Sequence, residues 1–212
     1  NLKKMTPLHL AINNKNMKLI ELILSKKKVK FDIQDADGFT PLLLAINMNS
    51  PDLTEFILNL LNRKEILKGI NICDKSNERT PFLASTLNSS TEIFSKFLTL
   101  NEVDFDCRDK KGRTALYLLV KSVFKANIDD VNERIVMLLD KRPSLLNIPT
   151  KSGKTPLFCS MQKIYDPIKT SEIILYLLDQ ENIDLSLPDV LAEPEQKSET
   201  NKSKKKKEKF VS

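Results

Sequence analysis

The chain has 212 residues, 41% of them hydrophobic, and a formal net charge of +6, which suits one sizeable domain with a packed core and a tail. It has only four glycines and no GxGxxG or GxxxxGK[ST] pattern, so nucleotide binding through glycine-rich loops is not expected. The sequence contains no run of eighteen apolar residues, so we do not expect a transmembrane helix. The first residues, NLKKMTPLHL, carry neither an initiator methionine nor a signal region, and we expect an excerpt from a longer polypeptide.

A six-residue motif recurs five times along the chain. It begins at Thr6 (TPLHLA), Thr40 (TPLLLA), Thr80 (TPFLAS), Thr114 (TALYLL) and Thr155 (TPLFCS), in steps of 34, 40, 34 and 41 residues. Turn-like segments precede the last four copies: DADGF, DKSNER, DKKGR and TKSGK. An apolar run such as MKLIELIL follows each copy. Five copies of a three-part unit indicate a repeat architecture.

Each part of the unit has a physical reason. Threonine is a good N-cap, and proline suits the first position of a helix, where its missing N–H costs nothing. Leu8, Leu10 and Ala11 then give a short helix one apolar face. The second helix, for example residues 17–24, is apolar on most sides. Because no single unit buries these faces alone, the units are expected to stack.

The unit is similar to the ankyrin repeat, with its T-P-L-H-x-A pattern, over residues 5–189. The resemblance implies an all-α solenoid of stacked antiparallel helix pairs, with a β-turn or hairpin finger projecting between successive pairs. The segments KFDIQD, GINICD, DFDCRD, LLNIPT and IDLSLPD are interpreted as finger strands. We expect a repeat array over residues 1–189 and a disordered tail rich in Lys, Glu and Ser over residues 190–212.

The repeats depart from a regular pattern at several points. Extra residues occur in NRKEILKG of repeat two, in LVKSVFKANIDDVNE of repeat four and in QKIYDPIKT of repeat five. Those of repeat two are expected to lengthen its second helix or to bulge the loop after it. These insertions either form binding loops or are neutral changes that the fold tolerates because lengthening a loop costs little. The turn DKSNERT has one residue more than the others and no glycine. An irregular cap over the last helix is expected from Leu185, Leu187, Val190 and Leu191.

No constellation for catalysis is found. His9 is the only histidine, and the resemblance implies that it is a structural hydrogen-bonding residue; the matching positions hold Leu43, Leu83, Tyr117 and Phe158. Asp35 and Asp109 are expected to accept backbone hydrogen bonds within their turns. The three cysteines, Cys73, Cys107 and Cys159, are interpreted as thiols in a reducing compartment. No enzymatic activity, cofactor or metal is therefore expected.

The ankyrin resemblance implies a protein partner bound on a concave surface made by the finger tips and the first helix of each pair. The residues of this chain that match that surface are Asp37, Phe39, Lys75, Arg79, Lys110, Lys111, Arg113, Lys151 and Lys154. With Arg108, the basic members predict a positive stripe, which Lys121 and Lys163 would extend. The stripe is either a dock for an acidic or phosphorylated segment or ordinary solvated surface. Phe39 either anchors a partner or packs on its neighbouring finger.

The function expected from these observations is a non-catalytic protein-interaction module of a scaffold or adaptor protein, monomeric within a longer chain and cytoplasmic. The alternative is a binder of nucleic acid or another anionic surface through the basic tips and the tail. Few aromatic residues lie among the basic ones, and 28 acidic residues dilute the positive field, which disfavours the alternative. The run Lys204–Lys207 is either a nuclear-localisation patch or part of a solubilising linker.

Overall fold

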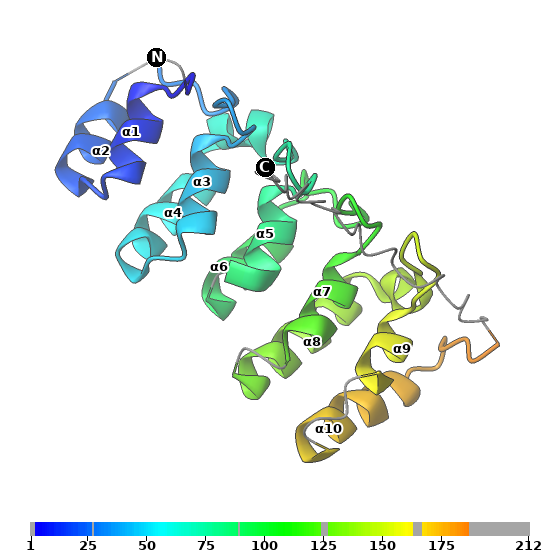
Figure 1. Ribbon diagram of the computed structural model, residues 1–212. Helices are drawn as coiled ribbons and strands as arrows, with labels where there is room; N and C mark the ends of the chain where they lie inside the picture. The colour runs from blue at the N-terminus through cyan, green and yellow to red at the C-terminus, as the bar shows by residue number, and fades with distance from the viewer. Residues whose placement is uncertain (1–2, 27, 89, 124–126, 163–166, 187–212) are drawn as a thin grey trace, which may run out of the picture.

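The structure is a computed structural model that describes residues 3–26, 28–88, 90–123, 127–162 and 167–186 (Figure 1). The α-helices of this part of the chain come in pairs, which confirms the expected all-α solenoid. The pairs are α1 (Pro7–Asn13) with α2 (Met17–Leu24), α3 (Pro41–Met48) with α4 (Thr54–Leu61), α5 (Pro81–Asn88) with α6 (Thr91–Leu98), α7 (Ala115–Ser122) with α8 (Ile128–Lys141), and α9 (Pro156–Met161) with α10 (Pro167–Leu178).

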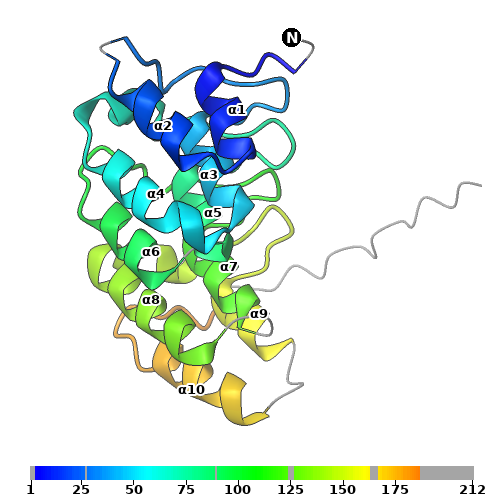
Figure 2. The ribbon, with the colours of Figure 1, turned by 90° about the vertical axis from the view of Figure 1, so that its left-hand side faces the viewer.

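The helix pairs stack in chain order into two layers. The first helices form one layer, in which α1 packs on α3, α3 on α5, α5 on α7 and α7 on α9. The second helices form the other layer, in which α4 packs on α6 and α6 on α8 (Figure 2). Loops that precede each first helix project in a row along one side of the stack. Each pair thus contacts mainly its neighbours, as in other solenoids.

The recurring threonine begins each first helix as predicted. Thr6, Thr40, Thr80, Thr114 and Thr155 each accept a hydrogen bond through Oγ1 from the backbone N–H three residues on, at donor–acceptor distances of 3.2–3.4 Å. Proline fills the first helical position in all of these helices except α7, which begins with Ala115. Both features satisfy or remove N–H groups that a helix start leaves without a partner.

Removing one of these caps gives a direct test of the repeat alignment. Thr40 is completely buried, so Thr40→Ala should lower the free energy of unfolding by about 1 kcal/mol. Urea unfolding followed by circular dichroism measures the change. The control is Thr99→Ala, because Thr99 is exposed and its hydroxyl donates to the Lys96 carbonyl at a helix C-terminus. Equal effects of the two substitutions would contradict the capping role of Thr40.

Phe31, Phe56 and Tyr117 are buried singly in other repeats, but repeat three gathers several buried aromatic side chains. There the Phe82 ring lies 5.6 Å from the ring centroid of Phe94 and 5.0 Å edge-on from that of Phe105. Phe97 packs at 6.0 Å on the same ring. All four side chains are buried, so the middle of the array is held by an aromatic cluster.

Two expectations about local structure were inexact. The fingers were expected to contain strands, but the described residues contain none, because neighbouring fingers exchange single backbone hydrogen bonds rather than a ladder. The extra residues of repeat two neither lengthen α4 nor bulge freely; they form the 3₁₀-helix η2 (Lys64–Gly69). Two further 3₁₀-helices, η1 (Pro51–Leu53) and η3 (Pro143–Asn147), precede α4 and follow α8.

The remaining expectations fall partly outside the described residues. Residues 124–126 and 163–166, in the insertions of repeats four and five, are among those not described, as is the tail from residue 187 onward. The cap residues Leu187, Val190 and Leu191 therefore stay a prediction. Leu185 is described, and its side chain is 70% exposed.

Candidate partner-binding surface

Four fingers precede helices α3, α5, α7 and α9, and each is a tight turn closed by its own backbone. We define them as finger 1 (residues 35–39), finger 2 (74–79), finger 3 (109–113) and finger 4 (150–154). In each finger the first residue donates its N–H to the carbonyl of the last, at 2.9–3.0 Å. The first side chain is buried in every case: Asp35, Asp74, Asp109 and Thr150.

The first side chain of each finger accepts hydrogen bonds from the turn above it, as predicted for Asp35 and Asp109. Asp35 Oδ1 accepts from the N–H groups of Asp37 and Phe39 at 3.0 and 2.8 Å. Asp109 Oδ1 accepts from those of Lys111 and Arg113, both at 3.0 Å. These bonds explain why acidic residues begin the turns: they bind free backbone donors and fix the tips.

Fingers 1, 3 and 4 use glycine where the chain takes a left-handed conformation, with φ of +89°, +74° and +77° at Gly38, Gly112 and Gly153. Finger 2 lacks glycine and is one residue longer, and Glu78 takes that conformation with φ of +56°. Asp74 compensates by accepting from three backbone N–H groups, those of Ser76, Asn77 and Arg79, at 2.7–3.2 Å. The irregular turn seen in the sequence is therefore closed by extra hydrogen bonds.

Backbone hydrogen bonds also join each finger to the one before it. The N–H of Lys75 donates to the Asp37 carbonyl at 3.1 Å, and the N–H of Lys110 donates to the Asn77 carbonyl at 2.8 Å. The N–H of Lys151 donates to the Lys111 carbonyl at 3.0 Å. This chain of bonds holds the four tips in one fixed register, so residues at equivalent tip positions lie in a row.

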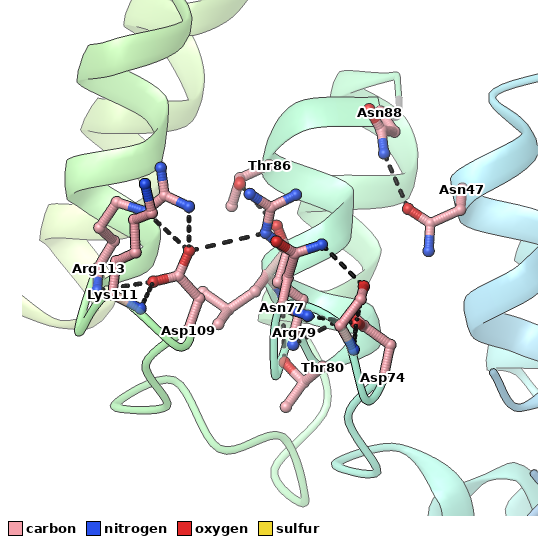
Figure 3. A network of polar contacts seen from close by, with 12 residues as sticks. Asn47, Asp74, Asn77, Arg79, Thr80, Thr86, Asn88, Asp109, Lys111 and Arg113 are labelled. Atoms are coloured by element: carbon pink, nitrogen blue, oxygen red, sulfur yellow. Dashed lines mark hydrogen bonds and ion pairs between the residues drawn. The ribbon is translucent and has the colours of Figure 1, made fainter. Parts of the chain in front are cut away.

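Two of the three arginines of the predicted stripe, Arg79 and Arg113, converge on one carboxylate (Figure 3). Arg113 Nε donates to Asp109 Oδ2 at 2.8 Å, and Arg79 Nε of the neighbouring finger lies 3.7 Å from the same oxygen. The Asp109 side chain is 1% exposed, and those of Arg79 and Arg113 are 20% and 12% exposed. Both guanidinium charges are thus largely neutralised within the fold and tie finger 2 to finger 3.

The environment of Asp109 favours its charged form. Burial alone would raise the pKa of this carboxyl, but hydrogen bonds from the Arg113 side chain and from backbone N–H groups outweigh burial and lower the pKa. The pKa of Asp74 is likewise lowered, because its bonds from Asn77, Ser76 and Arg79 outweigh burial. Both turn carboxylates therefore stay ionised well below neutral pH.

The lysines of the predicted site differ from the arginines in exposure. Lys75, Lys110, Lys111 and Lys151 are all exposed at the tips of fingers 2, 3 and 4. Lys75 Nζ donates to the Ala36 carbonyl at 2.9 Å. Lys154 is half-buried, and its Nζ donates to Gln162 Oε1 at 3.4 Å. The structure therefore separates two structural arginines, Arg79 and Arg113, from the solvent-facing lysines at the tips: Lys75, Lys110, Lys111 and Lys151.

The other residues of the predicted surface lie on finger 1, beside finger 3 and on α7. Asp37 is exposed at the tip of finger 1, whereas Phe39 is half-buried and packs against the core. Arg108 is exposed just before finger 3, and Lys121 is exposed at the end of α7. Lys163, the predicted extension into the last repeat, lies outside the described residues.

His9 is a structural residue, as the resemblance implied. Its ring is completely buried; Nδ1 accepts from the Thr6 N–H at 3.2 Å, and Nε2 lies 2.9 Å from the Phe39 carbonyl. A carbonyl only accepts, so Nε2 carries the proton and donates. The ring thereby completes a capping box on α1 and links α1 to finger 1.

The three cysteines form no disulfide with one another. All three are thiols, and Thr80 Oγ1 lies 3.3 Å from Cys107 Sγ. Burial raises the pKa of Cys107 to about 12, which disfavours the thiolate needed of a nucleophile or metal ligand. Within the described ranges no group of three or more His, Cys, Asp or Glu side chains is arranged to hold a metal ion. The same ranges contain no helix long and apolar enough to cross a membrane.

Sequence reasoning missed two polar links between neighbouring repeats. Asn88 Nδ2 donates to Asn47 Oδ1 at 3.0 Å, joining the ends of α5 and α3 (Figure 3). Gln34 Nε2 donates to the carbonyls of Gly38 and Cys73 at 2.7 and 2.9 Å, joining fingers 1 and 2. The first link could have been predicted from the asparagine that follows the capping threonine by seven or eight residues. No sequence pattern indicates the second link.

Comparison with known proteins finds a family model and a curated relative that match this chain. Residues 1–67 match a family model described as ankyrin repeats (3 copies). A curated relative, the B-cell lymphoma 3 protein homolog of Mus musculus, is 25% identical over 162 residues. That alignment covers 74% of this chain and 33% of the mouse protein, so the chain spans about a third of the relative's length.

Solved structures share the fold at low identity. The ankyrin repeat protein EF0377 superposes with a TM-score of 0.72 at 22% identity, covering 88% of this chain and 86% of its own. An ankyrin repeat domain from Acinetobacter baumannii gives 0.65 at 21%, covering 86% and 84%. A chain from the complex of the predatory endopeptidase Bd0816 of Bdellovibrio bacteriovorus with immunity protein Bd3460 gives 0.66 at 18%, covering 90% and 89%.

Proposed function

Because the chain belongs to the ankyrin repeat family, whose members are generally protein-interaction modules without enzymatic activity, we propose that it binds a protein partner across its fingers. The partner segment is acidic or phosphorylated and extended. It lies across the exposed lysines of fingers 2, 3 and 4, which we call the lysine row: Lys75, Lys110, Lys111 and Lys151.

The observation that carries this proposal is the fixed register of the fingers. Lys75, Lys110 and Lys151 each donate a backbone N–H to the preceding finger, so their side chains project from equivalent places on a rigid frame. Because the fingers are already ordered before a partner binds, only the lysine side chains of this chain lose conformational entropy on binding. Lysine ammonium groups in a row suit carboxylate or phosphate groups spaced along an extended segment.

The arginines have a different role in this proposal. Asp109 pairs with both Arg79 and Arg113, so these arginines stabilise the fingers. Their paired charges attract a partner only weakly. Binding through exposed lysines should weaken as salt rises. One structural neighbour comes from a complex between two proteins. The cytoplasm as the place of action, and nuclear entry through residues 204–207, stay predictions.

Selection from a random peptide library tests the proposal. The bait is the 212-residue chain, and we expect the retained peptides to be enriched in Asp and Glu. The variant Lys110→Glu, Lys111→Glu, Lys151→Glu should lower their affinity at least tenfold, measured by fluorescence anisotropy. A matched variant, Lys64→Glu, Lys68→Glu, Lys141→Glu, makes the same change in net charge at exposed lysines outside the fingers and should bind normally.

Three results would overturn parts of the proposal. Retained peptides without enrichment in Asp and Glu would refute a partner segment that is acidic without phosphorylation. Equal losses in the two triple variants would show that net charge alone matters, which refutes the lysine row. If single-stranded RNA bound more tightly than any peptide and still bound after deletion of residues 194–212, the nucleic-acid alternative would replace a protein partner.

A further inference from the structure

The lysine row has one lysine at the same place in each of fingers 2, 3 and 4. Lys75, Lys110 and Lys151 are the second residues of their fingers, and each donates its backbone N–H to the finger before it. The helices that follow these fingers, α5, α7 and α9, pack on one another in chain order. The axes of packed helices lie about 8–10 Å apart, so the three lysines recur at roughly that interval.

This interval selects among the backbone conformations that an extended partner can take. A polyproline II segment rises about 3.1 Å per residue with three residues per turn, so every third side chain faces the same way, about 9.3 Å further on. In a β-strand, side chains on one face are two residues and about 6.6 Å apart, or four residues and about 13 Å apart. The lysine row therefore fits a polyproline II segment better than a strand.

An α-helical segment is the competing arrangement, because it repeats one face after seven residues, about 10.5 Å further on. Three anions at that spacing need about fifteen residues of helix but only about seven residues of polyproline II. A short acidic peptide is mostly unfolded in water, where polyproline II is already a major conformer. Binding as a helix would therefore cost more conformational entropy than binding as polyproline II.

Finger 3 carries the most positive tip of the lysine row. Its third residue is Lys111, whereas the third residues of fingers 2 and 4 are Ser76 and Ser152. Finger 2 also contains the exposed Glu78. A phosphate carries a charge of about −1.5 to −2 at neutral pH, so it gains more than a carboxylate from the two adjacent ammonium groups of Lys110 and Lys111. The middle one of three anions is therefore the best place for a phosphate.

Finger 1 limits the row to three anions. Its second residue is Ala36, whose carbonyl accepts from Lys75 Nζ at 2.9 Å, and its third residue is Asp37. Asp37 is exposed at the tip, so a fourth anion three residues beyond the one at Lys75 would meet a like charge. Asp37 therefore acts as a specificity-determining residue at the end of the row.

On the basis of the proposed function, we propose that the partner segment binds as polyproline II with three anionic groups at three-residue spacing. One anion lies over each of fingers 2, 3 and 4. A phosphoserine over finger 3 binds more tightly than a glutamate there, and Asp37 of finger 1 disfavours a fourth anion.

Nine-residue peptides of one composition test the spacing. Each contains three glutamates, with proline and alanine elsewhere, and the glutamates are spaced by two, three or four residues around the same central position. Binding to the 212-residue chain is measured by fluorescence anisotropy at low ionic strength, where charge pairs are least screened. The peptide spaced by three should bind at least about threefold more tightly than the others, because each lost lysine–carboxylate pair costs up to about fivefold.

Lysine variants assign each anion to its finger. Lys75→Gln and Lys151→Gln alter exposed side chains at the two ends of the row. Removing one terminal glutamate should weaken binding to the unmodified chain but not to one of these variants, and removing the other terminal glutamate should pair with the other variant. Lys68→Gln is the control, because Lys68 is exposed on η2, outside the fingers, and should be coupled to neither glutamate.

Phosphoserine and a fourth glutamate test the two remaining assignments. Replacing the middle glutamate with phosphoserine should raise affinity more than replacing either outer one, and Lys111→Gln should remove that difference. A fourth glutamate, three residues beyond the end that is coupled to Lys75, should not raise affinity for the unmodified chain. It should raise affinity for Asp37→Lys.

The outcomes separate the spacing from the proposed function. Equal affinities of the three spacings would overturn the spacing and leave an acidic partner in place. Tightest binding at a spacing of two would indicate a strand, and tighter binding of a helical peptide with glutamates seven residues apart would indicate a helix; either result overturns polyproline II. An equal gain from phosphoserine at every position would overturn the role of finger 3. If no acidic or phosphorylated peptide bound, the proposed function and the spacing would both be wrong.

Discussion

Replacing Asp109 with asparagine should lower the free energy of unfolding by about 2–3 kcal/mol, one of the two largest effects expected for a single substitution in this chain. The carboxylate is buried and bonds to Arg113, to two backbone N–H groups and to Arg79 of the neighbouring finger. Removing one partner of a buried ion pair typically costs roughly 3–5 kcal/mol. The value here lies lower, because both arginines keep some contact with solvent.

Urea unfolding at neutral pH measures the effect, with Asp106→Asn as the control. Asp106 lies three residues earlier, is exposed, and its substitution should change stability by no more than about 0.5 kcal/mol. An effect of Asp109→Asn as small as that of the control would contradict the joining of fingers 2 and 3 through Asp109.

The same variant predicts a dependence on pH. The folded-state pKa of Asp109 is below its ordinary value of 3.8, so its charged form stabilises the fold at every pH above that value. The stabilisation is lost as the pH falls from about 4 through the lowered folded-state pKa. The difference in unfolding free energy between the unmodified chain and Asp109→Asn should therefore be constant from pH 7 to pH 5 and shrink below pH 4. A difference that grew on acidification would contradict the lowered pKa.

The repeat register could be predicted from the sequence, because each capping threonine and each turn acts locally. Thr40 caps α3 through the N–H three residues on, and Asp35 bonds within five residues, so both follow from short patterns. The role of His9 depends on Phe39, thirty residues away, and was reached only through the family resemblance. Local chemistry thus predicts the units and the direction of the stack.

The candidate site was harder to predict, because side-chain partners come from neighbouring fingers. The sequence places Arg79, Lys110 and Arg113 in one basic stripe, with no sign that Asp109 binds both arginines. That distinction depends on how closely finger 2 approaches finger 3, which spacing alone does not give.

Replacing Gly112 with valine should destabilise the chain by more than about 2 kcal/mol, because two costs combine. Gly112 has φ of +74°, a conformation that costs a non-glycine residue roughly 1–3 kcal/mol and a β-branched residue most. A Cβ at this position would also lie 2.7 Å from the backbone N of Lys151. That N–H donates to the Lys111 carbonyl, so the clash would push finger 4 away from finger 3.

Two further substitutions separate the cost of the left-handed backbone conformation from the cost of the Cβ contact. Glu78 occupies the corresponding place before the last residue of its finger with φ of +56°, so Glu78→Gly should relieve strain and be neutral or stabilising by up to about 1 kcal/mol. Gly112→Asn tolerates the left-handed conformation but keeps the Cβ, so its destabilisation should fall between glycine and valine. Urea unfolding of the three variants measures the order. If the Gly112→Asn variant were as stable as the unmodified chain, fingers 3 and 4 would not approach each other as closely as described. The fixed register on which the lysine row depends would then be wrong as well.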